Sequence, residues 1–200
     1  LKIALATALV AGAIVAWPNI SIPQEADAST QTAFIAKLVK GAQTNERKTG
    51  IPASVTIGMA ALESGWGRST MATTVPATKT ADGKKHTVNT LFNIKCGKTP
   101  SPHQTGCVPV RTAEYRKDGS KYYIVDEFRT YAGWGDSVLD YGRLLTSLSR
   151  YASAFDYTDY PDQFVIQVHR GGYATDPTYA TTVIGIMKKY DLYRYNVSGA

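Results

Sequence analysis

The chain has 200 residues, of which 44% are hydrophobic, 19% charged and 10% aromatic. This composition suffices for one domain with a substantial core and excludes an intrinsically disordered chain. Lysine and arginine outnumber aspartate and glutamate by 22 to 16, so the net charge is +6. A basic chain favours acidic partners such as nucleic acid, anionic lipid or anionic cell-wall polymers, and charge alone does not choose among them.

The N-terminus is typical of an export signal. Lys2 precedes an uncharged apolar run, and residues 26–28 have the small-x-small pattern that signal peptidase cleaves. We therefore expect residues 1–28 to be a signal peptide and residues 29–200 to be the exported domain, secreted or associated with the cell wall. The alternative is an uncleaved anchor, but the apolar run is short for a membrane span, so we expect no integral span.

The chain contains two cysteines, Cys96 and Cys107. An even number of cysteines in an exported chain predicts one disulfide, which here closes a short loop. The alternative is a zinc site that also uses His86 and His103. No C-x-x-C or H-x-x-x-H pair is present, which disfavours zinc, and we predict no metal and no cofactor.

Two consecutive helices are predicted after the signal segment. The first extends from Ser29, where capping residues stand, to Gly50. The second follows Pro52, a residue suited to a first helical turn, and ends at two glycines. Its apolar residues recur at i, i+4, i+7 and i+11, which predicts one buried face. These residues are Val55, Met59, Leu62 and Trp66.

A loop-rich segment and a hairpin follow the second helix. Residues 72–107 are rich in Thr, Lys, Gly and Pro, which predicts mostly loop. Two β-rich runs then flank Asp118-Gly119, a strong turn signal, so we predict a β-hairpin. Three further helices are expected, from Trp134, at Gln163–His169 and from Pro177 to Lys188. The predicted fold class is α+β, with a mainly helical core and a small β-hairpin lobe.

Glu63 is the first candidate for chemistry. It lies near the end of the second helix, at the margin of the apolar face, in the segment LESGWGRS. Partial burial disfavours the ionised form and raises the pKa of a carboxyl group toward the value that a general acid needs. The structural alternative is a solvated glutamate or a salt bridge with Arg68. Two glycines and Trp66 beside the carboxylate favour close approach of a ring-shaped ligand, although Trp66 also falls on the apolar stripe.

A general acid that acts on a glycosidic bond usually has a second carboxylate opposite it. The predicted hairpin offers Glu114, Asp126 and Glu127. Alternation along a strand places Asp126 and Glu127 on opposite faces. Each of the three could instead be a solvated strand charge, and the sequence leaves the choice among them open.

Several motifs, taken in order, resemble the glucosaminidase family of bacterial cell-wall hydrolases, glycoside hydrolase family 73. They are IPASVTIGMAALESGWGRS, LFNIKC, the hairpin with TAEY and FRTY, DSVLDYGRLL and GGYATDPTYATTVIGIMKKY. The resemblance covers about residues 32–192 and implies a lysozyme-like α+β fold that cleaves the β-1,4 bond after N-acetylglucosamine in peptidoglycan. It also implies Glu63 as the catalytic acid, Glu114 as the second carboxylate and Tyr173 as a residue lining the catalytic cleft.

Other residues near these motifs receive predicted roles. Asp176 is expected to cap the last helix and so to be structural. Family members often have NLFG where this chain has TLFN, and many lack the two cysteines. The residues predicted to contact the glycan are Trp66, Phe92, Asn93 and Tyr115.

The sequence therefore predicts an exported, monomeric endo-β-N-acetylglucosaminidase. Its expected partners are peptidoglycan glycan strands and anionic wall polymers. A muramidase or lytic transglycosylase could also use a single helix-end glutamate, and an inactive glycan-binding module could keep the aromatic residues and the charge. The basic residues form no patch, which disfavours nucleic acid, and ESGWG lacks the G-x-S-x-G pattern of serine hydrolases.

Overall fold

The computed structural model describes residues 24–97, 99–115 and 119–197, without the side chains of residues 24–28, 114 and 115. The predicted signal peptide lies outside the described residues, apart from the backbone of residues 24–28, which begins the first helix. Among the described residues, no helix is both long enough and apolar enough to cross a membrane.

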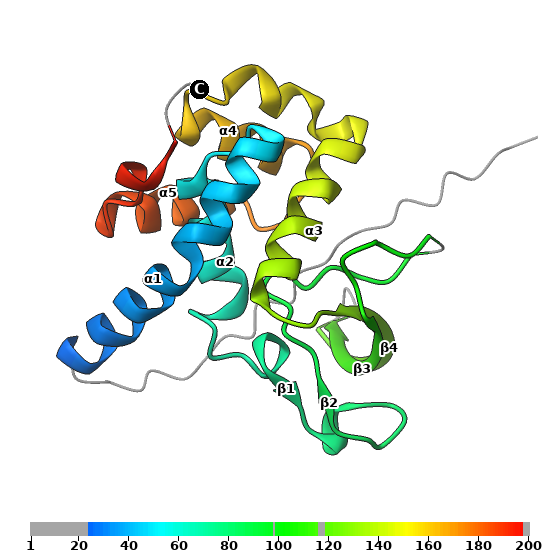
Figure 1. Cartoon of the computed structure of the whole chain (residues 1–200). Helices are drawn as coiled ribbons and strands as arrows, with labels where there is room; N and C mark the ends of the chain where they lie inside the picture. The colour runs from blue at the N-terminus through cyan, green and yellow to red at the C-terminus, as the bar shows by residue number, and fades with distance from the viewer. Residues whose placement is uncertain (1–23, 98, 116–118, 198–200) are drawn as a thin grey trace, which may run out of the picture.

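The helices lie on one side of the molecule and the strands on the other (Figure 1). We call the first part the helical lobe and residues 70–131 the β lobe. The helical lobe contains α1 (Gln24–Thr49), α2 (Ala53–Ser64), α3 (Trp134–Ser147), η3 (Ser149–Tyr157), α4 (Pro161–Arg170), α5 (Tyr179–Lys189) and η4 (Leu192–Tyr195). The β lobe contains η1 (Thr70–Ala72), β1 (Thr74–Val75), η2 (Ala77–Lys79), β2 (His86–Thr87), β3 (Gly106–Tyr115) and β4 (Lys121–Thr130). The α+β class is as predicted.

α2 is the centre of the helical lobe. The periodicity predicted one buried face, but the helix is buried on nearly all sides, because small residues fill the positions between the large ones. α1, α4, α5 and η4 pack around it. Gly58 permits the contact with α5, since a Cβ atom there would lie 3.0 Å from Cγ of Met187. The buried residues of α2 are Ala53, Ser54, Val55, Thr56, Ile57, Gly58, Met59, Ala60, Ala61 and Ser64.

The β lobe is built on the predicted antiparallel hairpin of β3 and β4. Its register runs from Gly106 opposite Thr130 to Tyr115 opposite Lys121. A small second core lies beneath the hairpin, separate from the core of the helical lobe. This second core contains Val75, Val88, Val108, Val110 and Phe128. The loop-rich segment before the hairpin adds one two-residue pairing, between β1 and β2.

The predicted disulfide joins Cys96 to Cys107, with 6.3 Å between the Cα atoms. It ties the end of the loop segment to the start of β3. The backbone N–H of Cys96 also donates to the carbonyl of Glu127 in β4, at 2.8 Å. Both thiols are therefore used in the cross-link, and no group of three or more metal-binding side chains is present among the described residues.

Candidate active site

A tight turn follows Glu63 at the C-terminal end of α2. Gly65, Trp66 and Gly67 all have positive φ values, of 56°, 59° and 73°. The Ser64 hydroxyl stabilises the turn, because it donates to the carbonyl of Ala60 at 2.6 Å and accepts from the N–H of Gly67 at 2.8 Å. Gly67 is required for two reasons: its φ is positive, and a Cβ atom there would lie 2.5 Å from Cη2 of Trp134. The ESGWG motif thus ends α2 abruptly, and Glu63 lies in the last turn of the helix.

Glu63 has the electrostatic character of a general acid. Its side chain is partly buried, and the Tyr179 hydroxyl donates to Oε1 at 3.0 Å. Burial raises the pKa of Glu63 from 4.5 to about 7, and the hydrogen bond from Tyr179 opposes part of this rise. A carboxyl group with such a pKa is protonated in a large fraction of molecules near neutral pH and can give its proton to a leaving group.

Tyr179 reaches Glu63 because of the turn that precedes α5. Asp176 Oδ1 accepts from the N–H of Thr178 at 2.8 Å and from its hydroxyl at 2.7 Å, so it fixes the turn before α5. The N-cap of α5 is Thr178 and has no side-chain capping hydrogen bond, so the aspartate is structural, as predicted, but it is not the N-cap residue. α5 then begins at Tyr179 itself. The motif GGYATDPTYA contains two tyrosines, and the one that reaches Glu63 is Tyr179, which was not among the predicted site residues.

Tyr173 lies beside this pair. Its ring centroid is 5.7 Å from that of Tyr179 and 6.3 Å from that of Tyr141. Burial, followed by the negative charge of Glu63, raises the pKa of both Tyr173 and Tyr179 well above the usual tyrosine range. The two hydroxyls are therefore neutral at physiological pH and able to donate hydrogen bonds. Tyr173 therefore belongs to the aromatic surroundings of Glu63, and its place in a catalytic cleft stays a prediction.

The loop of residues 90–96 lies against the backbone of Glu63. Asn93, at a positive φ of 50°, donates from Nδ2 to the carbonyl of Glu63 at 3.2 Å. Its Oδ1 is buried without a partner among the described residues. Phe92 stacks on Tyr141 with 4.1 Å between ring centroids and is only 2% exposed. Asn93 is thus positioned at the site, whereas the ring of Phe92 is core beneath it and offers no open surface to a sugar.

Unlike Asn93, neither Trp66 nor Tyr115 has a described contact with Glu63. The Trp66 ring packs edge-on against Phe34 and Tyr190, at centroid distances of 5.8 and 4.7 Å, so it contacts the core of the helical lobe. This contact matches the apolar stripe on which the residue falls. Tyr115 is the last residue of β3, and its side chain lies outside the described part of the structure.

The three hairpin carboxylates occupy distinct positions. Asp126 is bound by Lys95, at 2.8 Å, and by the hydroxyl of Thr112. Glu127 is exposed and belongs to the alternate row of the strand, as predicted. The backbone of Glu114 pairs with Tyr122, in the same row as Asp126, and the Glu114 side chain lies outside the described part.

The sequence matches the family model of the glucosaminidases, described as mannosyl-glycoprotein endo-beta-N-acetylglucosaminidase, over residues 39–192. The chain belongs to the glucosaminidase family. This match covers most of the helical lobe, all of the β lobe and every residue of the site described above.

Glucosaminidase relatives include the peptidoglycan hydrolase FlgJ of Vibrio cholerae, 34% identical over 84% of this chain, and the exo-glucosaminidase LytG of Bacillus subtilis, 30% identical over 83%. The alignments cover 46% and 54% of those relatives, so the chain spans about half of their length.

Two solved structures of similar fold are those of a peptidoglycan hydrolase and of an autolysin. A mutant peptidoglycan hydrolase of Sphingomonas sp. A1 has a TM-score of 0.63 and 31% identity, over 82% of this chain and 96% of that one. The catalytic domain of the autolysin Auto of Listeria monocytogenes has a TM-score of 0.65 and 26% identity, over 90% and 99%. The described fold is therefore shared with these two proteins over more than four fifths of this chain.

Proposed function

We propose that this chain is a peptidoglycan hydrolase that cleaves the β-1,4 bond after N-acetylglucosamine within glycan strands. The observation that carries the proposal is the carboxyl group of Glu63, with a pKa of about 7 and a hydrogen bond from Tyr179. Its relatives named peptidoglycan hydrolase and exo-glucosaminidase support the same substrate class.

In the proposed reaction, Glu63 protonates the oxygen of the leaving sugar. The Tyr179 hydroxyl holds the carboxyl group in one orientation, since it fixes one of the two carboxyl oxygens. A hairpin carboxylate then assists the attacking water or stabilises positive charge at the anomeric carbon. Glu114 is the preferred candidate, because Asp126 is neutralised by Lys95 and Glu127 belongs to the opposite row of the strand.

The proposed place of action is outside the cytoplasm. The disulfide between Cys96 and Cys107 supports an oxidising compartment. Export after removal of residues 1–28, action as a monomer and attachment to anionic wall polymers belong to the same proposal. The net charge of +6 favours such attachment.

Product analysis tests the proposed cleavage. Purified peptidoglycan is digested with the protein, and the fragments are separated and identified by mass spectrometry with and without borohydride reduction. We expect fragments that end in reducible N-acetylglucosamine. Fragments that end in anhydro-muramic acid would identify a lytic transglycosylase, and reducible muramic acid ends would identify a muramidase. Binding to glycan without any cleavage would identify an inactive module.

A further inference from the structure

A buried polar network centres on Asp140 in α3, a residue that has no part in the proposed reaction. Asp140 is fully buried. Arg129 Nη1 donates to both of its carboxylate oxygens, at 3.1 and 2.8 Å, and the Tyr131 hydroxyl donates to Oδ2 at 2.8 Å. The hydroxyl of Ser101 donates to Oδ1. One carboxylate of the helical lobe therefore receives four hydrogen bonds from three residues of the β lobe.

The three donors come from different segments of the β lobe. Arg129 lies in β4, Tyr131 follows that strand, and Ser101 lies inside the loop closed by the disulfide. Arg129 is also the register partner of Cys107, so the disulfide and the ion pair meet at the same pair of hairpin residues. Asp140 thereby fixes the root of the hairpin and the disulfide loop against α3 at a single point.

Hydrogen bonds connect this point to Glu63. The backbone N–H of Arg129 donates to the carbonyl of Ile94 at 2.9 Å. The adjacent residue, Asn93, donates to the carbonyl of Glu63 at 3.2 Å. The orientation of the hairpin root is therefore coupled to the end of α2 through two hydrogen bonds and one peptide unit.

The burial of this ion pair is not explained by stability alone. Arg129 is 6% exposed and Asp140 is not exposed, so both charges have lost their hydration. Replacement of a buried ion pair by apolar residues is often neutral or stabilising, and a packed apolar contact would hold the lobes together equally well. A network with one arrangement of donors and acceptors fixes the relative orientation of the two lobes, because its hydrogen bonds have fixed directions. An apolar contact has no such directions.

We propose that Asp140 is a positioning residue, which sets the orientation of the β3–β4 hairpin relative to Glu63. The inference rests on the proposed function, in which the hairpin supplies the second carboxylate of the reaction. It assigns Asp140 no contact with substrate: the residue acts through Arg129, Tyr131 and Ser101.

The test replaces Asp140 by asparagine and measures kcat, KM and the distance between the lobes. Asp140→Asn places an amide among three hydrogen-bond donors, so the network loses its single arrangement. We expect kcat to fall about 100-fold, as for a small misplacement of a reacting group, with a much smaller change in KM. Spin labels on Val125→Cys in the hairpin and Arg170→Cys in α4 should give a broader distance distribution than in the protein with Asp140. Both labelled positions are exposed.

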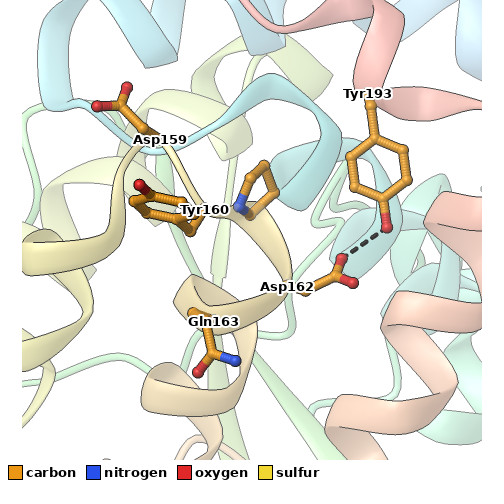
Figure 2. A pocket seen from close by; sticks show the side chains of 6 residues that line it. Asp159, Tyr160, Asp162, Gln163 and Tyr193 are labelled. Atoms are coloured by element: carbon orange, nitrogen blue, oxygen red, sulfur yellow. Dashed lines mark hydrogen bonds between the residues drawn. The ribbon is translucent and has the colours of Figure 1, made fainter.

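Asp162→Asn is the matched control. Asp162 also accepts from a tyrosine, Tyr193, at 2.6 Å, and pairs with Lys188 at 3.3 Å. Figure 2 shows this aspartate and Tyr193 at a pocket of about 270 Å³ beside the N-terminal end of α4. No residue of the Glu63 site lines this pocket. We expect the control to lower thermal stability while kcat and the distance distribution stay as in the wild type.

The outcomes separate the two proposals. A wild-type protein that cleaves no glycan contradicts the proposed function, and the distance distributions still test the positioning of the hairpin. If Asp140→Asn keeps the wild-type kcat below its melting temperature, or loses kcat with an unchanged distance distribution, the positioning role is wrong. If Asp140→Asn does not fold, Tyr131→Phe and Ser101→Ala each remove one hydrogen bond and leave the ion pair. Wild-type kcat and distances in both would overturn the inference.

Discussion

At the scale of single residues, the chemistry of the site depends on how two effects balance at Glu63. Burial raises the pKa of Glu63, and the hydrogen bond from Tyr179 lowers it, with the result near 7. Without burial the group would be ionised at neutral pH and unable to donate a proton. Without the tyrosine, the carboxyl group would have no fixed orientation and an even higher pKa.

We predict that Tyr179→Phe moves the alkaline limb of the kcat/KM profile to higher pH. In the wild type we expect this limb near pH 7, because the proposed reaction requires protonated Glu63. The tyrosine stabilises the ionised form, so its removal raises the pKa of Glu63, by about one pH unit for a hydrogen bond to a charged group. The measurement is the pH dependence of glycan cleavage between about pH 5 and pH 9.

Tyr173→Phe is the control for this prediction. Its hydroxyl makes no hydrogen bond to Glu63 among the described contacts, whereas its ring lies 5.7 Å from that of Tyr179. We expect its alkaline limb to stay at the wild-type pH. An equal shift in both variants, or a shift to lower pH in Tyr179→Phe, would show that the hydrogen bond does not set the pKa of Glu63.

Glu63 could be predicted from the sequence and Tyr179 could not, for a physical reason. Glu63 stands at the edge of an apolar helix and beside a glycine turn, which are both local signals. The bond from Tyr179 joins residues 116 positions apart and exists only because α5 packs on α2. Phe92 shows the converse case, since an aromatic residue in a family motif was expected at the glycan and is buried against Tyr141.

Among the elements of the β lobe, the hairpin must keep one orientation relative to Glu63, because it is proposed to supply the second carboxylate. The disulfide loop is joined to the start of this hairpin. The turn signal at 118–119 and the alternating β-rich runs sufficed to predict the hairpin, because these signals are local. The attachment of the hairpin to α3 could not be predicted. Asp140 is a charged residue in an amphipathic helix, where the pattern favours exposure, and only the approach of Arg129 makes its burial possible.

We predict that the double variant Cys96→Ser and Cys107→Ser folds but loses about 3 kcal/mol of unfolding free energy, the entropy of a loop of this length. The sequence separation of the two cysteines is 11. Urea denaturation of the variant and of the wild type, in the absence of reductant, measures the difference.

The same variant separates a structural from a functional effect of the disulfide. Ser101, inside the loop, keeps its hydrogen bond to Asp140. We therefore expect kcat to fall much less than in Asp140→Asn. An unfolding free energy equal to that of the wild type would show that the loop is held by its hydrogen bonds alone.

At the scale of the whole molecule, a helical lobe that supplies the acid is joined to a β lobe that is proposed to supply the second carboxylate (Figure 1). The class of this fold was predictable, because it follows from the order of helices and strands. The contacts between the lobes were not, since the motifs that contain Asn93 and Arg129 do not show which atoms of the other lobe these residues bind.

We predict that the affinity for cell walls depends on salt. The net charge of +6 attracts anionic wall polymers. Salt screens this attraction, and the distance over which it acts becomes shorter as the salt concentration rises. The wall-bound fraction of the inactive Glu63→Gln variant should fall between about 0.05 M and about 0.5 M NaCl. Lys84→Gln with Lys85→Gln, two exposed positions, should weaken binding at low salt and make little difference at high salt. A bound fraction that is independent of salt would contradict the electrostatic account.

The rate of glycan cleavage by Glu63→Gln shows directly whether Glu63 is the proton donor. Glutamine has nearly the same shape and can accept the hydrogen bond from Tyr179, but it carries no acidic proton. The account predicts a rate at least about 100-fold below that of the wild type, with an unchanged circular dichroism spectrum. A folded Glu63→Gln protein that cleaves purified peptidoglycan as fast as the wild type would contradict it.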